Sequence, residues 1–284
     1  MYLEHFGLTS FPFATTPDPR FYYPSAKHRE ALACLLYAVE QRKGFGLVSG
    51  EVGAGKSMLC RAAIEQLGDK ADIALVVHTL VTPKQFFQVV CDEFGISTKN
   101  RSKIQLIGAI KKFLLERHAA GRTVVLIVDE AQNLDSNVLE EVRLLGNLET
   151  TSEKLVQILL VGQPELRQLI GSPEHRQLNQ RITVKFHLGA LTEEDVHGYV
   201  DHRLHVAGAV RNGLFDADAK HELFRASGGV PRMLNVICDQ ALLQAFVNEQ
   251  HAVPRDLVRR VVADMEGYYM DTPPAQERPS ERMH

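Results

Sequence analysis

Residues 45–57 read FGLVSGEVGAGKS and constrain the architecture more strongly than any other segment of the chain. The segment begins with a short apolar run, Phe45–Ser49, that has the length of a buried strand, and a helical pattern starts at Lys56. Between them, Gly50–Ser57 matches the pattern GxxxxGK(S/T), the phosphate-binding loop or Walker A motif. Backbone N–H groups of such a loop surround phosphate oxygens, and the dipole of the following helix adds to the attraction. The segment therefore predicts the strand–loop–helix unit of a P-loop nucleotide-binding protein.

The residue types in this loop suit phosphate chemistry. Gly50, Gly53 and Gly55 permit backbone angles and a close approach that a Cβ would block. Lys56 neutralises phosphate charge, and the hydroxyl of Ser57 can coordinate Mg²⁺. We expect ATP to contact the loop and the first turn of its helix, which comprise Gly50, Glu51, Val52, Gly53, Ala54, Gly55, Lys56, Ser57 and Met58.

A second motif follows the most apolar run of the chain. Residues 124–130 read VVLIVDE, the pattern of a Walker B strand end. An acid at the carboxyl end of a buried strand reaches a metal ion, and a carboxylate directly after it can polarise an attacking water. We therefore predict that Asp129 holds Mg²⁺ and that Glu130 acts as the catalytic base. The apolar run Ile73–His78 between the two motifs is typical of the P-loop branch whose members hydrolyse ATP through a glutamate.

Strand-like runs alternate with helical patterns as far as residue 190, and only helical patterns follow. Continuous Val/Ile/Leu strands that alternate with helices indicate a parallel sheet with helices on both faces. The expected strands are 45–49, 73–78, 123–128, 155–161 and 182–188. The expected parts are an aromatic-rich segment and helix packing on the core (1–44), a P-loop α/β domain (45–190), a small all-α lid domain (191–269) and a disordered tail (270–284).

Composition excludes several classes of protein. The 284 residues are 45% hydrophobic and 24% charged, which is unlike a collagen-like or wholly disordered chain. No run approaches the ~18 apolar residues that span a bilayer, and no signal peptide begins the chain. The 4 cysteines form no CxxC pair, so we expect a reducing cytoplasm. A net charge of -3 would confine any contact with DNA to a local patch such as Lys99–Lys112.

Further motifs give the chain a more specific resemblance. They are YLEHFGL at 2–8, TPDPRF at 16–21, DEAQ at 129–132, GQPEL at 162–166, LNQRI at 178–182 and SGGVPRMLN at 227–235. With the two nucleotide motifs, they make residues 2 to about 266 resemble the AAA+ ATPases of the general secretion pathway protein A (ExeA-like) family. The resemblance implies Mg·ATP bound at the junction of a P-loop domain and a helical lid.

The resemblance also implies roles for four polar residues. Gln163 stands where the family has its sensor 1 residue, near the γ-phosphate and the water. Arg181 stands where AAA+ proteins place an arginine finger that reaches the nucleotide of a neighbouring subunit, and Arg176 is an alternative. Arg232 matches sensor 2, a lid arginine that touches the γ-phosphate. A guanidinium suits these roles because it offers several donors to phosphoryl oxygens.

One expectation concerns the strand inserted between the two motifs. If it lies beside the strand that ends at Asp129, then His78 or Thr79 neighbours Glu130 and can hold its carboxylate away from water until a partner binds. A capped strand end is the alternative interpretation.

For the biological output, the resemblance implies a homo-oligomeric ATPase that assembles or energises a secretion, pilus or exopolysaccharide export system. Its partners would be envelope or export-system proteins that recruit it from the cytoplasm to the inner membrane. Family members often carry a membrane span and a peptidoglycan-binding segment after the ATPase, and we expect neither here. The alternative is an ATP-dependent DNA-binding regulator resembling the transposition target-selection ATPases. A small-molecule P-loop kinase is a third interpretation, disfavoured by Asp129, Glu130 and the lid arginine.

Overall fold

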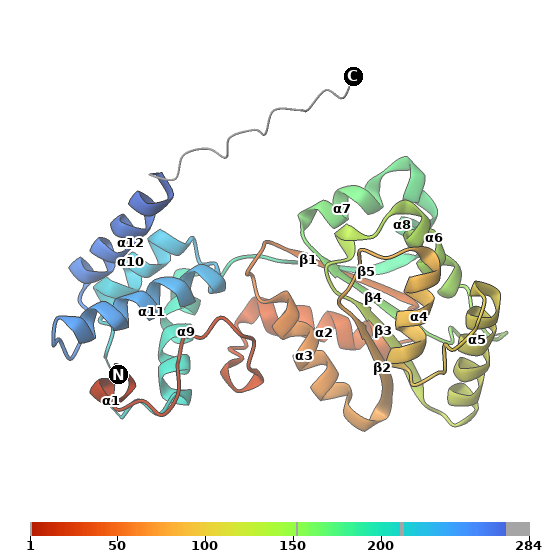
Figure 1. Cartoon of the computed structure of the whole chain (residues 1–284), viewed down its shortest axis with the longest axis horizontal. Helices are drawn as coiled ribbons and strands as arrows, with labels where there is room; N and C mark the ends of the chain where they lie inside the picture. The colour runs from red at the N-terminus through yellow and green to blue at the C-terminus, as the bar shows by residue number, and fades with distance from the viewer. Residues whose placement is uncertain (1, 152, 211–212, 271–284) are drawn as a thin grey trace, which may run out of the picture. The chain divides into compact units, whose positions relative to one another are not determined.

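The computed structural model describes residues 2–151, 153–210 and 213–270 (Figure 1). The chain divides into two compact units. Residues 17–190 form an α/β unit, and the residues up to Thr16 join those from Leu191 onward in a helical unit. The tail expected at 270–284 falls outside the described residues, apart from Met270 at the end of the last helix. In the part of the chain that is described, no helix combines the length and apolar character that crossing a membrane requires.

The α/β unit is built on five parallel strands in the order β2-β3-β4-β1-β5. Their bounds are β1 Phe45–Gly50, β2 Ala71–Val76, β3 Thr123–Val128, β4 Gln157–Gly162 and β5 Ile182–Leu188. The predicted parallel sheet is therefore confirmed. Both central strands β1 and β4 are buried along their whole length, as expected for strands with helices on either side.

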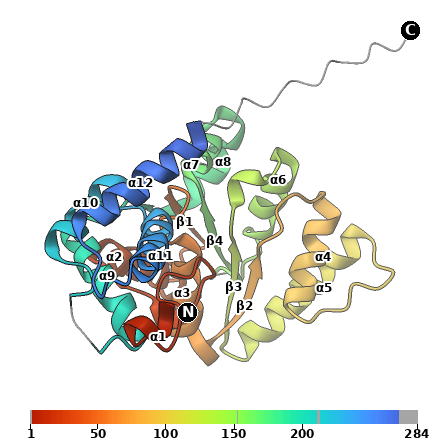
Figure 2. The same cartoon turned by 60° about the vertical axis from the view of Figure 1, so that its left-hand side comes forward.

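Helices cover the two faces of the sheet (Figures 1 and 2). On one face lie α2 Ala26–Glu40 and α3 Lys56–Leu67; on the other lie α4 Pro83–Glu93, α5 Lys103–Ala119, α6 Ser136–Leu145, α7 Pro164–Gly171 and α8 Arg176–Arg181. Alternate residues of each strand point to opposite faces. Val48 accordingly packs in the core under α2 and α3, and Leu47 packs in the core under the other five helices.

Polar N-cap residues precede α4 and α6. The side chain of Thr82 accepts from the Gln85 N–H and that of Asp135 from the Val138 N–H, which satisfies otherwise unpaired first-turn donors. Helix α6 ends at Leu145. Gly146 follows it, and a Cβ there would stand 2.2 Å from the Phe45 ring. Glycine favours helix termination, and its small size allows this close approach to the start of β1.

The helical unit contains α9 Glu193–Val206, α10 Ala217–Ser227, α11 Pro231–Val247, α12 Arg255–Met270 and the short N-terminal α1 Tyr2–Phe6. The first sixteen residues join this unit, whereas the expected division kept 1–44 together as a segment and helix packing on the core. Tyr2 donates to Asp239 at 2.5 Å, and Phe13 is buried against Phe215. Aromatic content correctly indicates burial of this segment. It does not identify the core that receives the rings.

Candidate functional site

The predicted nucleotide motifs meet at one edge of the sheet. All five strands are parallel, so their carboxyl ends lie at the same edge. The phosphate loop follows β1, Asp129 follows β3, and Gln163 follows β4. Because β4 lies between β3 and β1, the residue after β4 is placed between the phosphate loop and the acidic pair.

The backbone of the loop requires glycine at two of its predicted positions. Gly55 has φ +99°, and a Cβ there would stand 2.8 Å from Nε2 of His28. Gly50 has no room either, because a Cβ would stand 2.6 Å from the carbonyl oxygen of Leu188. A side chain at either position would displace the loop or its support, which explains the glycine spacing of the motif.

Lys56 is folded into the loop. Its side chain is buried, and Nζ donates to the carbonyl oxygens of Gly50 at 2.8 Å and of Glu51 at 3.0 Å. Its described contacts involve no carboxylate. The ammonium is therefore held by groups that a phosphate can replace without breaking an ion pair.

Ser57 and Asp129 lie together, as predicted for a magnesium site. The Ser57 hydroxyl donates to Asp129 Oδ2 at 2.8 Å, and Oδ1 accepts the Glu130 N–H at 2.9 Å. Asp129 is only 6% exposed. Within the described residues, no group of three or more His, Cys, Asp or Glu side chains forms a metal cage. One carboxylate and one hydroxyl fit Mg²⁺, which takes few protein ligands and completes its shell with water and phosphate oxygens.

Glu130 is placed by its backbone and by two amides. Its φ of 51° lies in the left-handed region, which is uncommon for a residue other than glycine. Gln132 Nε2 donates to Glu130 Oε2 at 2.5 Å, and Gln163 Nε2 donates to the same oxygen at 3.1 Å. Burial alone raises the pKa of Glu130, but the two amide hydrogen bonds and the charge of Lys56 hold it below its usual value. The carboxylate is therefore ionised at neutral pH.

Gln132 is the site residue to which sequence reasoning assigned no role. It stands in the DEAQ motif, but its contact with Gln163 depends on the neighbouring strand. The expected neighbourhood of β2 and β3 is present, because the Asp129 N–H donates to the Val76 carbonyl at 2.9 Å. Thr79 is buried and His78 exposed, yet neither has a hydrogen bond to Glu130 among the described residues. Gln132 and Gln163 make the hydrogen bonds to Glu130 instead.

The arginines suggested by the resemblance do not take part in these hydrogen bonds. Exposed Arg176 begins α8, and half-buried Arg181 ends it. Arg232 is the exposed second residue of α11, in the helical unit. The turn before it is fixed by Gly229, whose φ is +74° and whose added Cβ would stand 2.1 Å from the carbonyl oxygen of Leu191. Within the helical unit, the start of α11 therefore lies close to Leu191, the residue at which the chain re-enters this unit.

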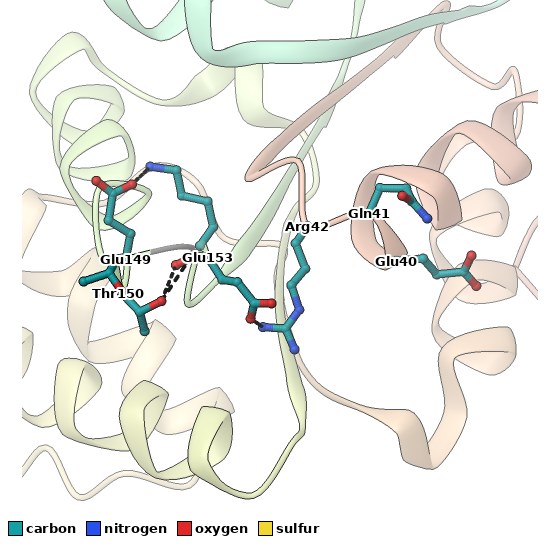
Figure 3. A pocket seen from close by; sticks show the side chains of 8 residues that line it. Glu40, Gln41, Arg42, Glu149, Thr150 and Glu153 are labelled. Atoms are coloured by element: carbon teal, nitrogen blue, oxygen red, sulfur yellow. Dashed lines mark hydrogen bonds and ion pairs between the residues drawn. The ribbon is translucent and has the colours of Figure 1, made fainter.

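A hollow lies where strands β1 and β4 begin (Figure 3). Its volume is about 550 Å³, and it is lined by Glu40, Gln41, Arg42, Glu149, Thr150, Thr151, Glu153 and Lys154. Arg42 pairs with Glu153 at 2.7 Å, and Lys154 pairs with Glu149 (Figure 3). Both cations are already neutralised, so this hollow does not resemble a phosphate site.

Comparison with known proteins is consistent with this geometry. Residues 39–170 match the model of a family described as AAA domain. The chain is 43% identical over 254 residues to general secretion pathway protein A of Aeromonas hydrophila. That match covers 89% of this chain and 46% of the relative, so the chain spans about half the length of the relative.

Solved structures share the fold at low sequence identity. Cdc6p of Pyrobaculum aerophilum has a TM-score of 0.69 at 16% identity, covering 92% of this chain and 74% of that one. The ADP form of the ORC2 protein of Aeropyrum pernix has a TM-score of 0.68 at 15% identity, covering 89% and 72%. The RuvB Holliday junction branch migration motor of Thermotoga maritima has a TM-score of 0.55 at 16% identity, covering 84% and 69%. The phosphate loop, the strand order and these matches together show a P-loop ATPase fold with an AAA domain, in a chain similar to general secretion pathway protein A.

Proposed function

We propose that this chain hydrolyses ATP in a Mg²⁺-dependent reaction, as a homo-oligomer, to assemble or energise a secretion, pilus or exopolysaccharide export system. The observation that carries the site assignment is a continuous set of hydrogen bonds. It joins Ser57 of the phosphate loop to Asp129 and Glu130, and Glu130 to Gln163. The ends of β1, β3 and β4 would thereby supply the phosphate loop, the acidic pair Asp129–Glu130 and Gln163, in that order.

The phosphate loop would bind the triphosphate through its backbone N–H groups. Lys56 would turn from the carbonyls of Gly50 and Glu51 to the phosphate oxygens, and Ser57 with Asp129 would hold Mg²⁺. When bound, the metal neutralises charge on the β- and γ-phosphates. Catalysis in this reaction class comes mostly from positioning and electrostatic stabilisation, and buried donors at the carboxyl edge of the sheet would supply both.

Glu130 would act as the base for the attacking water. Both amide donors bind Oε2, so Oε1 is the oxygen that accepts a hydrogen bond from water. An ionised carboxylate near neutral pH meets the requirement for a general base. Gln163, at the end of β4, would then orient the water or the γ-phosphate.

Arginines would complete the site from outside the phosphate loop. We assign Arg232 to the γ-phosphate in the same subunit and Arg181, with Arg176 as the alternative, to the nucleotide of a neighbouring subunit. ATP turnover per subunit should then fall when the protein is diluted until it dissociates. Turnover that stays constant across that dissociation would contradict the assignment in trans.

The export role rests on sequence similarity to general secretion pathway protein A. The sharpest test uses Glu130→Gln, expressed beside the wild-type protein in its host. Inactive subunits should inhibit mixed oligomers and stop export of secreted protein or surface polysaccharide. The control is the double variant Glu130→Gln with Lys56→Ala, which should not bind ATP and should therefore inhibit export less.

Duplex DNA distinguishes the export role from that of a DNA-binding regulator. ATP-dependent assembly should be the same with and without duplex DNA if the protein serves export. A salt-sensitive, ATP-dependent shift of duplex DNA would instead indicate a DNA-binding regulator, because phosphate contacts release counterions. That result, with unimpaired export in the host, would overturn the export role and leave the ATPase assignment intact.

A further inference from the structure

Gln132 links two strand ends through a single side-chain amide. Its Nε2 donates to Oε2 of Glu130 at 2.5 Å, and its Oε1 accepts the backbone N–H of Gln163 at 3.0 Å. The side chain of Gln163 also donates to Glu130 Oε2, at 3.1 Å. The three residues form a closed ring of hydrogen bonds between the end of β3 and the end of β4.

The backbone around Gln132 fixes the position of its side chain. Glu130 adopts the left-handed conformation, and the 3-10 turn Ala131–Asn133 follows directly. Ala131 is fully buried, and the Asn133 N–H donates to the Glu130 carbonyl at 3.0 Å, which closes the turn. This turn directs Gln132 toward the start of α7.

Gly162 leaves the space that the Gln132 amide fills. A Cβ at Gly162 would stand 2.5 Å from Oε1 of Gln132 and 2.9 Å from a methyl group of Leu166. The last residue of β4 is therefore small at the point where the amide crosses from one strand end to the next. This fit distinguishes Gln132 from a surface glutamine whose hydrogen bond forms by chance.

We propose that Gln132 is the positioning residue of the hydrolytic site: it holds the Glu130 carboxylate in register with Gln163, with Oε1 presented to the attacking water. The proposal rests on the proposed role of Glu130 as the base. Hydrogen bonds to a charged group are among the stronger ones in proteins, so one amide can determine the rotamer of the glutamate. A base that moves by 1 Å loses much of its catalytic effect.

The test compares three substitutions. Gln132→Met keeps the length of the side chain and removes both hydrogen bonds. Gln132→Glu keeps an acceptor for the Gln163 N–H and replaces the donor with a carboxylate that repels Glu130. Gln168→Met, at an exposed position of α7, is the matched control for a glutamine-to-methionine change.

We expect Gln132→Met to lower kcat by roughly 10- to 100-fold. The Kd for ATP, measured by titration calorimetry, should change less than about twofold, and Tm by only a few degrees. Gln132→Glu should lower kcat at least as much, and Gln168→Met should change none of these quantities. A kcat for Gln132→Met that is unchanged or raised would overturn the proposal, and so would a loss of kcat matched by an equal loss of ATP affinity.

A double variant separates this proposal from the proposed function. If Gln132 acts through Glu130, then Glu130→Gln with Gln132→Met should turn over no more slowly than Glu130→Gln alone in single-turnover assays. A further decrease in the double variant would show that Gln132 acts elsewhere and would overturn the proposal. Full turnover of Glu130→Gln itself would instead reject Glu130 as the base.

Discussion

The two ends of the parallel sheet carry charged residues in different ways. Where strands begin, Arg42 and Glu153 form an ion pair whose side chains are 26% and 43% exposed, beside the hollow of Figure 3. Where strands end, Lys56 and Asp129 are 5% and 6% exposed, and Lys56 rests on backbone carbonyls. A hollow of about 550 Å³ is therefore not by itself a sign of a phosphate site. Two charges that neutralise each other attract a ligand only weakly. A buried ammonium held by carbonyl oxygens can instead exchange those oxygens for phosphate oxygens.

The cause lies in the direction of the strands. In an open parallel sheet, the helix that follows a strand begins at the carboxyl edge, so unpaired N–H groups and the positive end of the helix dipole lie there. Helix α3 begins at Lys56, directly at this edge. The opposite edge receives helix ends and loops, which favour paired surface charges.

The largest effect is expected from Lys56→Ala. The substitution removes the buried positive charge that would meet the triphosphate, so ATP affinity should fall by at least ~100-fold and turnover should be abolished. Fluorescent-nucleotide binding and phosphate release measure the two quantities. Undiminished affinity would mean that the carboxyl edge is not the phosphate site.

Glu130→Gln comes next. The substituted side chain keeps its size but cannot accept a proton, so kcat should fall by roughly 100- to 10,000-fold while ATP still binds. Single-turnover phosphate release and equilibrium binding separate the two effects. Equal losses of both would place Glu130 in binding rather than in hydrolysis.

Ser57→Ala should have a more specific effect. It removes the hydroxyl that contacts Asp129 and would coordinate Mg²⁺, so the Mg²⁺ concentration for half-maximal turnover should rise by roughly tenfold. A Mg²⁺ titration at saturating ATP measures the change. If the Mg²⁺ requirement is unaltered and only ATP affinity falls, the metal is not held at this position.

The smallest effect is expected at the other end of the sheet. Arg42→Met should leave kcat and ATP affinity unchanged and should reduce the free energy of unfolding by less than about 1 kcal/mol, since the Arg42–Glu153 pair is solvent-exposed. Urea denaturation and steady-state kinetics test both parts. A large loss of turnover would give the amino end of the sheet a catalytic role and would remove the contrast between the two ends.

Local patterns predict much of this molecule because they report local physics. Short continuous apolar runs identify the five strands, and the glycine spacing identifies the phosphate loop. The role of Gln132 was not predictable in this way, since its contact with Gln163 exists only once β3 and β4 are neighbours. His78 and Thr79 illustrate the same limit, because a correct strand neighbourhood does not determine which side chain reaches Glu130.

The core that receives the N-terminal aromatic residues was not predictable, for a related reason. Tyr2, Phe6 and Phe13 are buried, as aromatic residues in a short segment suggest, but periodicity does not say against which core they pack. The proposed roles of Arg181 and Arg232 depend on groups distant in sequence, so they rest on resemblance.

The attachment of the first residues to the helical unit has a consequence for biosynthesis. Tyr2 contacts Asp239, which lies 237 positions later in the chain, and at ~5–20 residues per second a ribosome takes roughly 10–50 s to reach it. During that interval the helices against which Phe6 and Phe13 pack have not been synthesised, whereas residues 17–190 can already fold. The helical unit is therefore completed after the α/β unit, and until its helices emerge the nascent chain carries an exposed aromatic segment that chaperones can recognise.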